Sequence, residues 1–263
     1  MAWVLALLFI FAAVAIAFAM SGLYGWFPLA ASAMARDYDD QFLLTLLLTG
    51  FFFILMHLIL SYIVVRFRGG RGPASYWHGN IKWVWAVIIV MALLDLGLAV
   101  GSESLWAKLH LTGSPPNVLQ IEVVGQQFVW TSRYKGPDGR FGRVKRDLVD
   151  DAINILGVDP ADPAGKDDVV LPTVFVPLGR PVELLLQSKD VIHSFFVREL
   201  RLKQDAVPGM RIPLRFTADR VGRYEVACAE LCGLGHHQMR TFLEVLEPEE
   251  YEKRMREELD ALL

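Results

Sequence analysis

The chain has 263 residues, of which 54% are hydrophobic and 21% are charged, and its formal net charge is −3. A net charge this close to zero argues against nucleic acid as a partner. The apolar residues are concentrated before Ser102, and the remainder has the mixed composition of a water-soluble domain. The composition therefore excludes a fully soluble enzyme, a disordered protein and a many-helix transporter, and it predicts a membrane anchor with one sizeable domain outside the membrane.

Three apolar segments are long enough for membrane-spanning helices, which need about 20 residues each. They cover residues 2–20, 42–65 and 83–100. The first could instead be a cleaved signal peptide, but it lacks a basic start and its apolar run is longer than usual, so we expect an uncleaved helix. The loop between the second and third segments carries four basic residues, Arg66, Arg68, Arg71 and Lys82. Cytoplasmic loops are enriched in Lys and Arg, so we expect the N-terminus in the cytoplasm and everything after Ser102 on the outer side.

Two polar residues, His57 and Asp95, fall within the predicted spans. An acid inside a membrane is costly, so Asp95 is a candidate for a proton path or an intersubunit contact. The simpler interpretation, which we expect, places Asp95 near the outer interface, some five residues before the helix leaves the membrane, where it reaches water. For His57 we expect a hydrogen bond between helices rather than a metal ligand.

From residue 117 to 247 the sequence has short strand patterns separated by turns rich in Gly, Pro and Asp. The runs are 118–124, 126–134, 169–176, 181–187, 192–197, 212–217, 223–228 and 239–246. Many short strands of this kind predict a β-sandwich or a small barrel. The polar stretch 135–168 is expected to be a surface excursion, and residues 248–263 have the pattern of an amphipathic helix.

The only two cysteines of the chain lie in one segment, CAELCGLGHHQM at residues 228–239. A disulfide does not account for the His and Met that follow, and zinc has no use for a thioether. Thiolate, imidazole and thioether together select copper. A single blue-copper site needs one Cys, two His and a weak axial Met, and His193 is the upstream candidate. The second cysteine is more than one copper needs, and two thiolates can bridge two metal ions.

This segment resembles the binuclear copper A motif of cytochrome c oxidase subunit 2, and all six fixed positions of that motif are present. The resemblance extends upstream to 125–130, 190–194 and 203–209, and it covers roughly residues 40–247. The predicted architecture is a transmembrane anchor of three α-helices followed by an all-β, cupredoxin-like sandwich or barrel. Its predicted parts are an additional N-terminal helix with an outer loop (1–41), a two-helix anchor with a cytoplasmic loop at 66–82 (42–106), a cupredoxin domain with the copper A site (107–247) and a C-terminal amphipathic helix (248–263).

The resemblance implies a set of copper ligands by position. Cys228 and Cys232 would be the bridging thiolates, His193 and His236 the terminal imidazoles, and Met239 and the backbone carbonyl of Glu230 the weak ligands. The Glu230 side chain would bind a magnesium ion shared with the catalytic subunit. No catalytic residue is expected in this chain itself.

The function implied by the resemblance is electron uptake by a terminal oxidase. Copper A would accept electrons from a c-type cytochrome and pass them to haem in the catalytic subunit 1, where oxygen is reduced to water. The implied partners are that subunit, which alone holds the haems, other oxidase subunits, the cytochrome donor and lipid of a bacterial inner (plasma) membrane, with the copper domain on the periplasmic side. Two alternatives are a copper A subunit of a nitric oxide reductase and a non-redox, cupredoxin-like assembly subunit, although the intact ligand set argues against the latter.

Two positions depart from the family pattern. Many members have a Trp two residues before Trp130, where they receive electrons from the cytochrome, and this chain has Phe128 there. Phe128 and Trp130 are therefore the candidates for electron uptake. Many members also have a Glu near the start of the second family helix, where this chain has Lys82, so a proton uptake role is not carried over.

Overall fold

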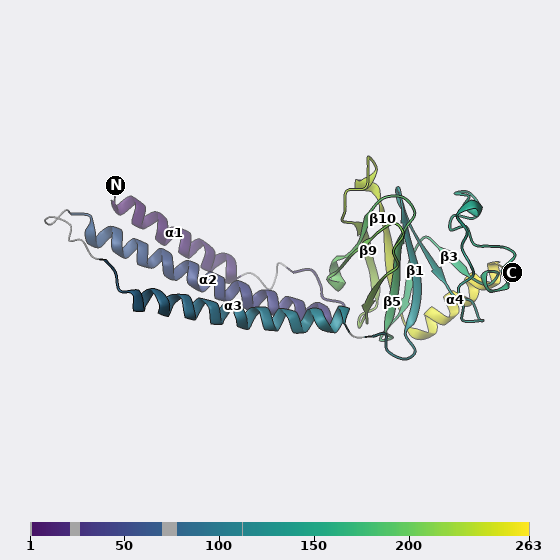
Figure 1. Cartoon of the computed structure of the whole chain (residues 1–263), viewed down its shortest axis with the longest axis horizontal. Coiled ribbons are helices and arrows are strands. Elements are labelled where there is room, and N and C mark those ends of the chain that lie inside the picture. The colour runs from purple at the N-terminus through teal and green to yellow at the C-terminus, as the bar shows by residue number, and fades with distance from the viewer. Residues whose placement is uncertain (1, 22–26, 70–77, 112, 263) are drawn as a thin grey trace. The chain divides into compact units, whose positions relative to one another are not determined.

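The computed structural model describes residues 2–21, 27–69, 78–111 and 113–262. The chain divides into two compact units. One comprises Met1–Pro28 and Asp37–Ala107 and is helical, and the other comprises Leu29–Arg36 and Lys108–Leu263 and is mainly β-structure (Figure 1).

The predicted three N-terminal helices are confirmed as α1 (Ala2–Ser21), α2 (Ala33–Phe67) and α3 (Ile81–His110). By length and composition, α2 and α3 are long and apolar enough to cross a membrane, whereas the apolar stretch Trp3–Phe18 of α1 is shorter. Both long helices extend beyond the predicted spans. The Ser32 hydroxyl accepts a hydrogen bond of 3.0 Å from the Ala35 backbone N–H, an N-cap that starts α2 ahead of its charged first turns.

Within the helical unit, polar and aromatic contacts join the helices. The Ser61 hydroxyl of α2 donates to the Ala6 carbonyl of α1 at 3.3 Å, and Ala6 is buried, as expected where helices approach closely. The Gln41 amide of α2 donates to the Ser102 hydroxyl of α3 at 3.1 Å. Of the predicted loop 66–82, residues 70–77, Arg71 among them, lie outside the described residues.

The second unit is a sandwich of two five-stranded sheets, which confirms the predicted all-β fold. The first sheet has the strand order β3 (Val169–Leu171), β2 (Val129–Tyr134), β1 (Leu119–Gln126), β5 (Val182–Ser188) and β8 (Ile212–Phe216). The second has the order β4 (Val174–Pro177), β10 (Arg240–Leu246), β9 (Gly222–Cys228), β6 (His193–Val197) and β7 (Leu202–Ala206). The predicted terminal helix is α4 (Pro248–Leu262).

Two features of the strands differ from the prediction. The single run 169–176 divides at Leu171, because β3 pairs with β2 in one sheet while β4 pairs with β10 in the other. Strand β7 was not predicted, since its sequence Leu-Lys-Gln-Asp-Ala has no apolar alternation. It forms by antiparallel pairing with β6, in which His193 lies opposite Ala206. Both differences concern pairing between distant segments, which a local pattern does not contain.

The core lies between the sheets, where alternate residues of each strand point inward. Fully buried side chains come from both sheets: Ile121, Val123, Leu184, Leu186, Phe195, Val197, Val226, Leu243 and Val245. The residues just before α2 also belong to this unit. The Ala31 N–H donates to the Glu199 carbonyl at 2.9 Å, and the Ala31 carbonyl accepts from the Asp219 N–H at 3.0 Å.

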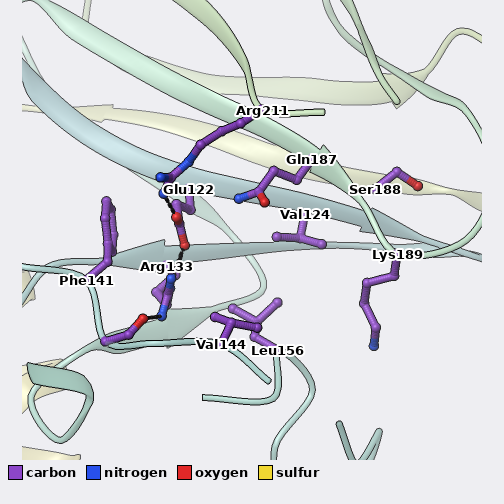
Figure 2. Close-up of a pocket in the computed structure, with 11 residues that line it drawn as sticks. Glu122, Val124, Arg133, Phe141, Val144, Leu156, Gln187, Ser188, Lys189 and Arg211 are labelled. Carbon is purple, nitrogen blue, oxygen red and sulfur yellow. Dashed lines mark hydrogen bonds and ion pairs between the residues drawn. The ribbon is translucent and has the colours of Figure 1, made fainter. Parts of the chain in front are cut away.

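The excursion 135–168 is irregular, with short 3-10 turns η2 (Arg146–Leu148) and η3 (Pro163–Gly165). It packs over Arg133 of β2, whose guanidinium is buried on the face of the sheet opposite the core. Arg133 donates to Asp168 at 3.1 Å. It also donates to Glu122 at 2.7 Å, and Glu122 pairs with Arg211 as well (Figure 2). The excursion therefore encloses a paired set of charges and is more than a surface loop.

Candidate metal centre

Strand pairing brings the upstream histidine to the cysteine segment. Strand β6 lies antiparallel to β9, with Phe195 opposite Cys228, so His193 at the start of β6 lies beside the end of β9. The Ala229 N–H donates to the Ser194 carbonyl at 2.9 Å and extends this pairing into the loop. The two strands thus hold His193 and Cys228 together although 35 residues separate them in the sequence.

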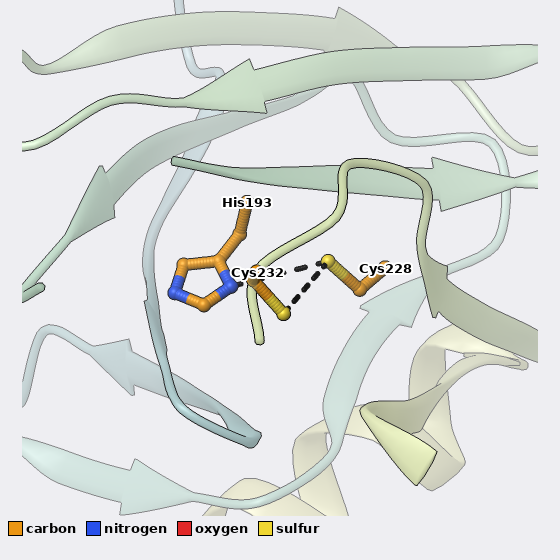
Figure 3. A group of neighbouring side chains, drawn as sticks. All are labelled: His193, Cys228 and Cys232. Atoms are coloured by element: carbon orange, nitrogen blue, oxygen red, sulfur yellow. Dashed lines mark hydrogen bonds between the residues drawn. The ribbon is translucent and has the colours of Figure 1, made fainter. Parts of the chain in front are cut away.

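The two cysteine sulfurs face one another without forming a disulfide. Their Sγ atoms are 3.8 Å apart and both thiols are free, whereas a disulfide bond is about 2.05 Å long. The Nδ1 atom of His193 lies 3.9 Å from Cys228 Sγ (Figure 3). The ligand atoms of His193, Cys228 and Cys232 all lie within 4.8 Å of one another. Among the described residues, this mutually close group contains one histidine.

The remaining predicted ligands approach from the other side of Cys232. His236 Nδ1 lies 3.6 Å and Met239 Sδ 3.7 Å from Cys232 Sγ. The Glu230 carbonyl oxygen lies 3.2 Å from Cys228 Sγ. Each predicted copper ligand other than the two cysteines therefore lies within 4 Å of a cysteine sulfur. A tight turn makes this convergence possible, because Gly233 adopts a φ of 139°, which favours glycine, and the short turn η5 (His236–Gln238) follows.

The cluster is buried at its centre and more exposed at one edge. His193, Cys228, Cys232 and Met239 are buried, whereas His236 is half-buried. Burial and the neighbouring Cys228 raise the pKa of the Cys232 thiol to about 11, so a bound metal must replace a thiol proton.

Asp190 holds the His193 ring in one orientation. The Nε2 atom of His193 donates to Asp190 Oδ1 at 2.7 Å, which leaves Nδ1 to face Cys228. Burial alone would raise the pKa of Asp190, but hydrogen bonds from the Gln127 backbone N–H and from His193 outweigh it and hold that pKa below its usual range. A ligating histidine whose second nitrogen donates to a carboxylate is the usual outer-shell arrangement in metal sites. Sequence reasoning did not assign this role, although an Asp three residues before the His was the available signal.

The donor set fits copper. Two sulfurs 3.8 Å apart can both reach one metal ion, since metal–thiolate bonds are about 2.3 Å long in zinc sites. Zinc sites take Cys and His but not Met, while soft thiolates and a thioether with imidazole suit copper. The buried His/Cys/Cys/Met cluster is therefore a fitting copper site.

Comparisons with known proteins agree with this geometry. Residues 119–246 match the family description "Cytochrome C oxidase subunit II, periplasmic domain". The alternative cytochrome c oxidase subunit 2 of Bradyrhizobium diazoefficiens is 37% identical over 224 residues, which cover 82% of this chain and 77% of that protein. The chain belongs to the cytochrome c oxidase subunit 2 family.

Other members of the family are more distant. Cytochrome c oxidase subunit 2 of Synechocystis sp. is 29% identical over 253 residues, covering 87% of this chain and 74% of that protein. Among solved structures, the periplasmic domain of subunit II of a Bradyrhizobium japonicum cytochrome oxidase is 26% identical, with a TM-score of 0.42, and the match covers 57% of this chain and all of that one. As a member of this family, the chain is a subunit of cytochrome c oxidase, anchored to a membrane by its helices.

The two residues predicted to take up electrons in this subunit 2 differ in their exposure to solvent. Phe128 is 37% exposed, and its ring packs so closely on the copper loop that a Cβ at Gly235 would lie 2.4 Å from it. Trp130 is only 1% exposed and lies edge-on to His193, with ring centroids 5.8 Å apart. A ring this buried is not available for direct contact with a donor, so of the two residues only Phe128 is exposed for such contact, and the electron-uptake role of both stays a prediction. Trp130 faces the core because β2 begins at Val129, whereas Phe128 lies in the turn before it.

Proposed function

We propose that the chain is the subunit through which a cytochrome c oxidase takes up electrons, and that it does so with a binuclear copper A centre. Cys228 and Cys232 would bridge the two ions, His193 and His236 would be the terminal ligands, and Met239 and the Glu230 carbonyl the weak ones. The donor would be a c-type cytochrome, and the acceptor would be haem in the catalytic subunit that reduces oxygen to water.

One observation carries this proposal. Two unbridged cysteine sulfurs lie 3.8 Å apart, and each has its own imidazole nitrogen, at 3.9 Å for Cys228 and 3.6 Å for Cys232. A single copper needs one thiolate, so a paired set with two thiolates and two imidazoles favours two ions. The relatives named above are cytochrome c oxidase subunits, which favours the oxidase over a nitric oxide reductase. The buried cluster of histidine, two cysteines and methionine argues against a non-redox assembly subunit.

A bound copper pair supplies one-electron transfer, and the chain's own residues restrict how far the site rearranges. His193 and Cys228 sit on paired strands of the second sheet, and the Gln127 amide donates to the Cys232 carbonyl from the first sheet. Buried ligands exclude water from the centre of the site. A coordination sphere held in this way changes little between oxidation states, which favours fast electron transfer.

Glu230 is proposed to serve two metals with two different groups. Its carbonyl faces Cys228, while its residue is exposed and leaves the carboxylate free for a partner. A carboxylate oxygen suits magnesium rather than copper, so we assign the side chain to a magnesium ion at the junction with the catalytic subunit. We also propose that the N-terminus lies in the cytoplasm and the copper domain on the periplasmic side of a bacterial inner membrane.

Metal analysis of the full-length chain in detergent tests the binuclear assignment. We expect two coppers per chain and an electron paramagnetic resonance spectrum in which the unpaired electron is shared by two copper nuclei. Cys232→Ser should abolish that spectrum, because a hydroxyl is a poor bridge for soft copper. Met239→Leu should alter it, whereas Met210→Leu, at an exposed methionine, should not. One copper per chain, or zinc, would contradict the proposal.

A further inference from the structure

A pocket of about 350 Å³ lies between α4 and the first sheet, and we call it the α4 pocket. Binding sites for small molecules have volumes of about 300–1,000 Å³, so this pocket is large enough for one. Tyr251, Met255 and Leu259 recur every four residues along α4, so the face of the helix that packs on the core also borders the pocket. The apolar wall consists of Val118, Leu119, Val169, Met255 and Leu259. The body of an organic ligand can bind along this wall.

The charged groups of the α4 pocket are mainly cationic. Arg180, Arg256 and Lys135 line it together with one acid, Glu252, so the lining has a formal charge of +2. Arg180 and Arg256 are exposed, and neither guanidinium has a hydrogen bond or an ion pair with any described residue. The Lys135 ammonium donates to Gln120 Oε1 at 2.7 Å, which holds it in place and leaves it further donors. The lining therefore offers several donors and an excess of positive charge.

Tyr251 adds a donor that is neutral and buried. Its side chain is only 5% exposed, and its hydroxyl has no hydrogen-bond partner within the described part of the chain. Burial raises the pKa of Tyr251 to about 12, although the charge of nearby Arg180 opposes the shift, so the hydroxyl keeps its proton at neutral pH. The hydroxyl of Tyr134, the other phenol in the lining, donates to the Phe175 carbonyl at 3.1 Å. A buried phenol normally has such a partner, so the acceptor for Tyr251 comes from outside the chain.

The pocket under the excursion 135–168 shows what a lining without a need for a ligand looks like (Figure 2). Its volume is similar, about 380 Å³, and it also contains three cations. There, however, Arg133 and Arg211 both pair with Glu122, and Lys189 donates to Asp151 at 3.0 Å. Those charges are balanced within the chain. The two unpaired guanidiniums and the unpartnered phenol therefore distinguish the α4 pocket as a site for an anion.

We propose that the α4 pocket binds a phosphate monoester with a small apolar body, its phosphate held by Arg180, Arg256 and Tyr251. A phosphate monoester carries a charge of about −1.5 to −2 at pH 7, which matches the lining, whereas a carboxylate carries only about −1. Guanidinium groups bind phosphate oxygens through paired, charge-assisted hydrogen bonds. A soluble phosphomonoester and the headgroup of phosphatidic acid share this chemistry. The site is separate from the metal cluster and does not depend on the proposed function.

Calorimetric titration of the full-length chain in detergent with phenyl phosphate tests the site. We expect saturable binding of one molecule per chain. Arg180→Gln and Arg256→Gln should each weaken binding by about tenfold, the scale of one charge-assisted hydrogen bond, and Tyr251→Phe should weaken it by about threefold to tenfold. Arg220→Gln, at an exposed arginine outside the lining, is the matched control and should bind like the wild type. Phenyl phosphate should also raise the thermal midpoint of the wild type more than that of Arg180→Gln, which separates binding from folding.

Three further probes identify the ligand chemistry. Inorganic phosphate lacks the apolar body and benzoate lacks the second charge, so each should bind about tenfold more weakly than phenyl phosphate. Phosphatidic acid added to the micelles should displace phenyl phosphate if a lipid headgroup is the natural source, whereas a soluble monoester as the source predicts no displacement. Either result retains the site. Absence of saturable binding, benzoate binding as tightly as phenyl phosphate, or an equal loss in Arg220→Gln would overturn the inference.

Discussion

The copper cluster has two unlike sides. The strand side, His193 and Cys228, is carried by paired strands, is buried, and is braced by Asp190 and the Trp130 ring. The loop side, residues 229–239, holds His236 half-buried on a short turn and exposes Leu231 and Leu234 by 78% and 98%. The difference indicates a division of work, in which the strand side sets the geometry of the metal site and the loop side presents it to other molecules.

The largest effect should come from the buried ion pairs of the first sheet, on the face opposite the core. Arg133 lies opposite Glu122 across the β1–β2 pair that also carries Trp130. Arg133→Met leaves two buried carboxylates without this partner, which should cost about 3–5 kcal/mol in the free energy of unfolding. The thermal midpoint of copper release from the full chain should fall by roughly 10 °C. Lys253→Met, which removes an exposed helix pair with Glu257, should change it little; an equal fall in both variants would show that burial is not the cause.

Removing the brace of the strand-side histidine should have the next largest effect. Asp190→Ala deletes the hydrogen bond to His193 Nε2, and loss of such an outer-shell partner typically lowers metal affinity about 10- to 100-fold. Asp190→Asn should lose less, since its amide oxygen still accepts the bond. Competition for copper with a chelator measures both, with the exposed Asp147→Ala as control. Unchanged affinity in Asp190→Ala would mean that the strands alone orient the ring.

Changes beside the loop side should affect binding of the electron donor rather than binding of the metal. Phe128→Leu shrinks the exposed ring that covers the copper loop, so KM for the cytochrome should rise by about threefold to tenfold, as for a moderate interface contact. Trp130→Phe, at a buried position, should leave KM unchanged. Steady-state oxidation of the reduced donor by the intact oxidase separates the two. A higher KM for the Trp130 variant alone would reverse the proposed division.

The smallest effect on copper is expected at Glu230. Glu230→Gln retains the carbonyl that faces Cys228 and weakens only the exposed carboxylate. Copper per chain should therefore stay at the wild-type value, while magnesium per oxidase should decrease. Elemental analysis of the intact complex measures both metals at once. Loss of copper would show that the carbonyl and the carboxylate do not act independently.

The ligands of the candidate site were largely predictable from the sequence, but the residues that hold these ligands in position were not. Cys228, Cys232, His236 and Met239 share one short segment, and their residue types already select copper. The bracing of His193 by Asp190, and the Gln127 amide on the Cys232 carbonyl, depend on a turn of the first sheet meeting loops of the second. Likewise, an arginine in a strand pattern does not reveal that the excursion 135–168 will bury it with Glu122 and Asp168.

By itself, the sequence determined the membrane helices, the all-β character of the second unit and the chemistry of the metal site. These properties depend on apolar length, strand periodicity and ligand type within short stretches, so a local pattern contains them. Only the tertiary structure decided that the run 169–176 divides between two sheets and that Trp130 is buried while Phe128 is exposed. Each of these outcomes depends on which distant segment covers a side chain, because burial and hydrogen bonding are set by contacts across the fold.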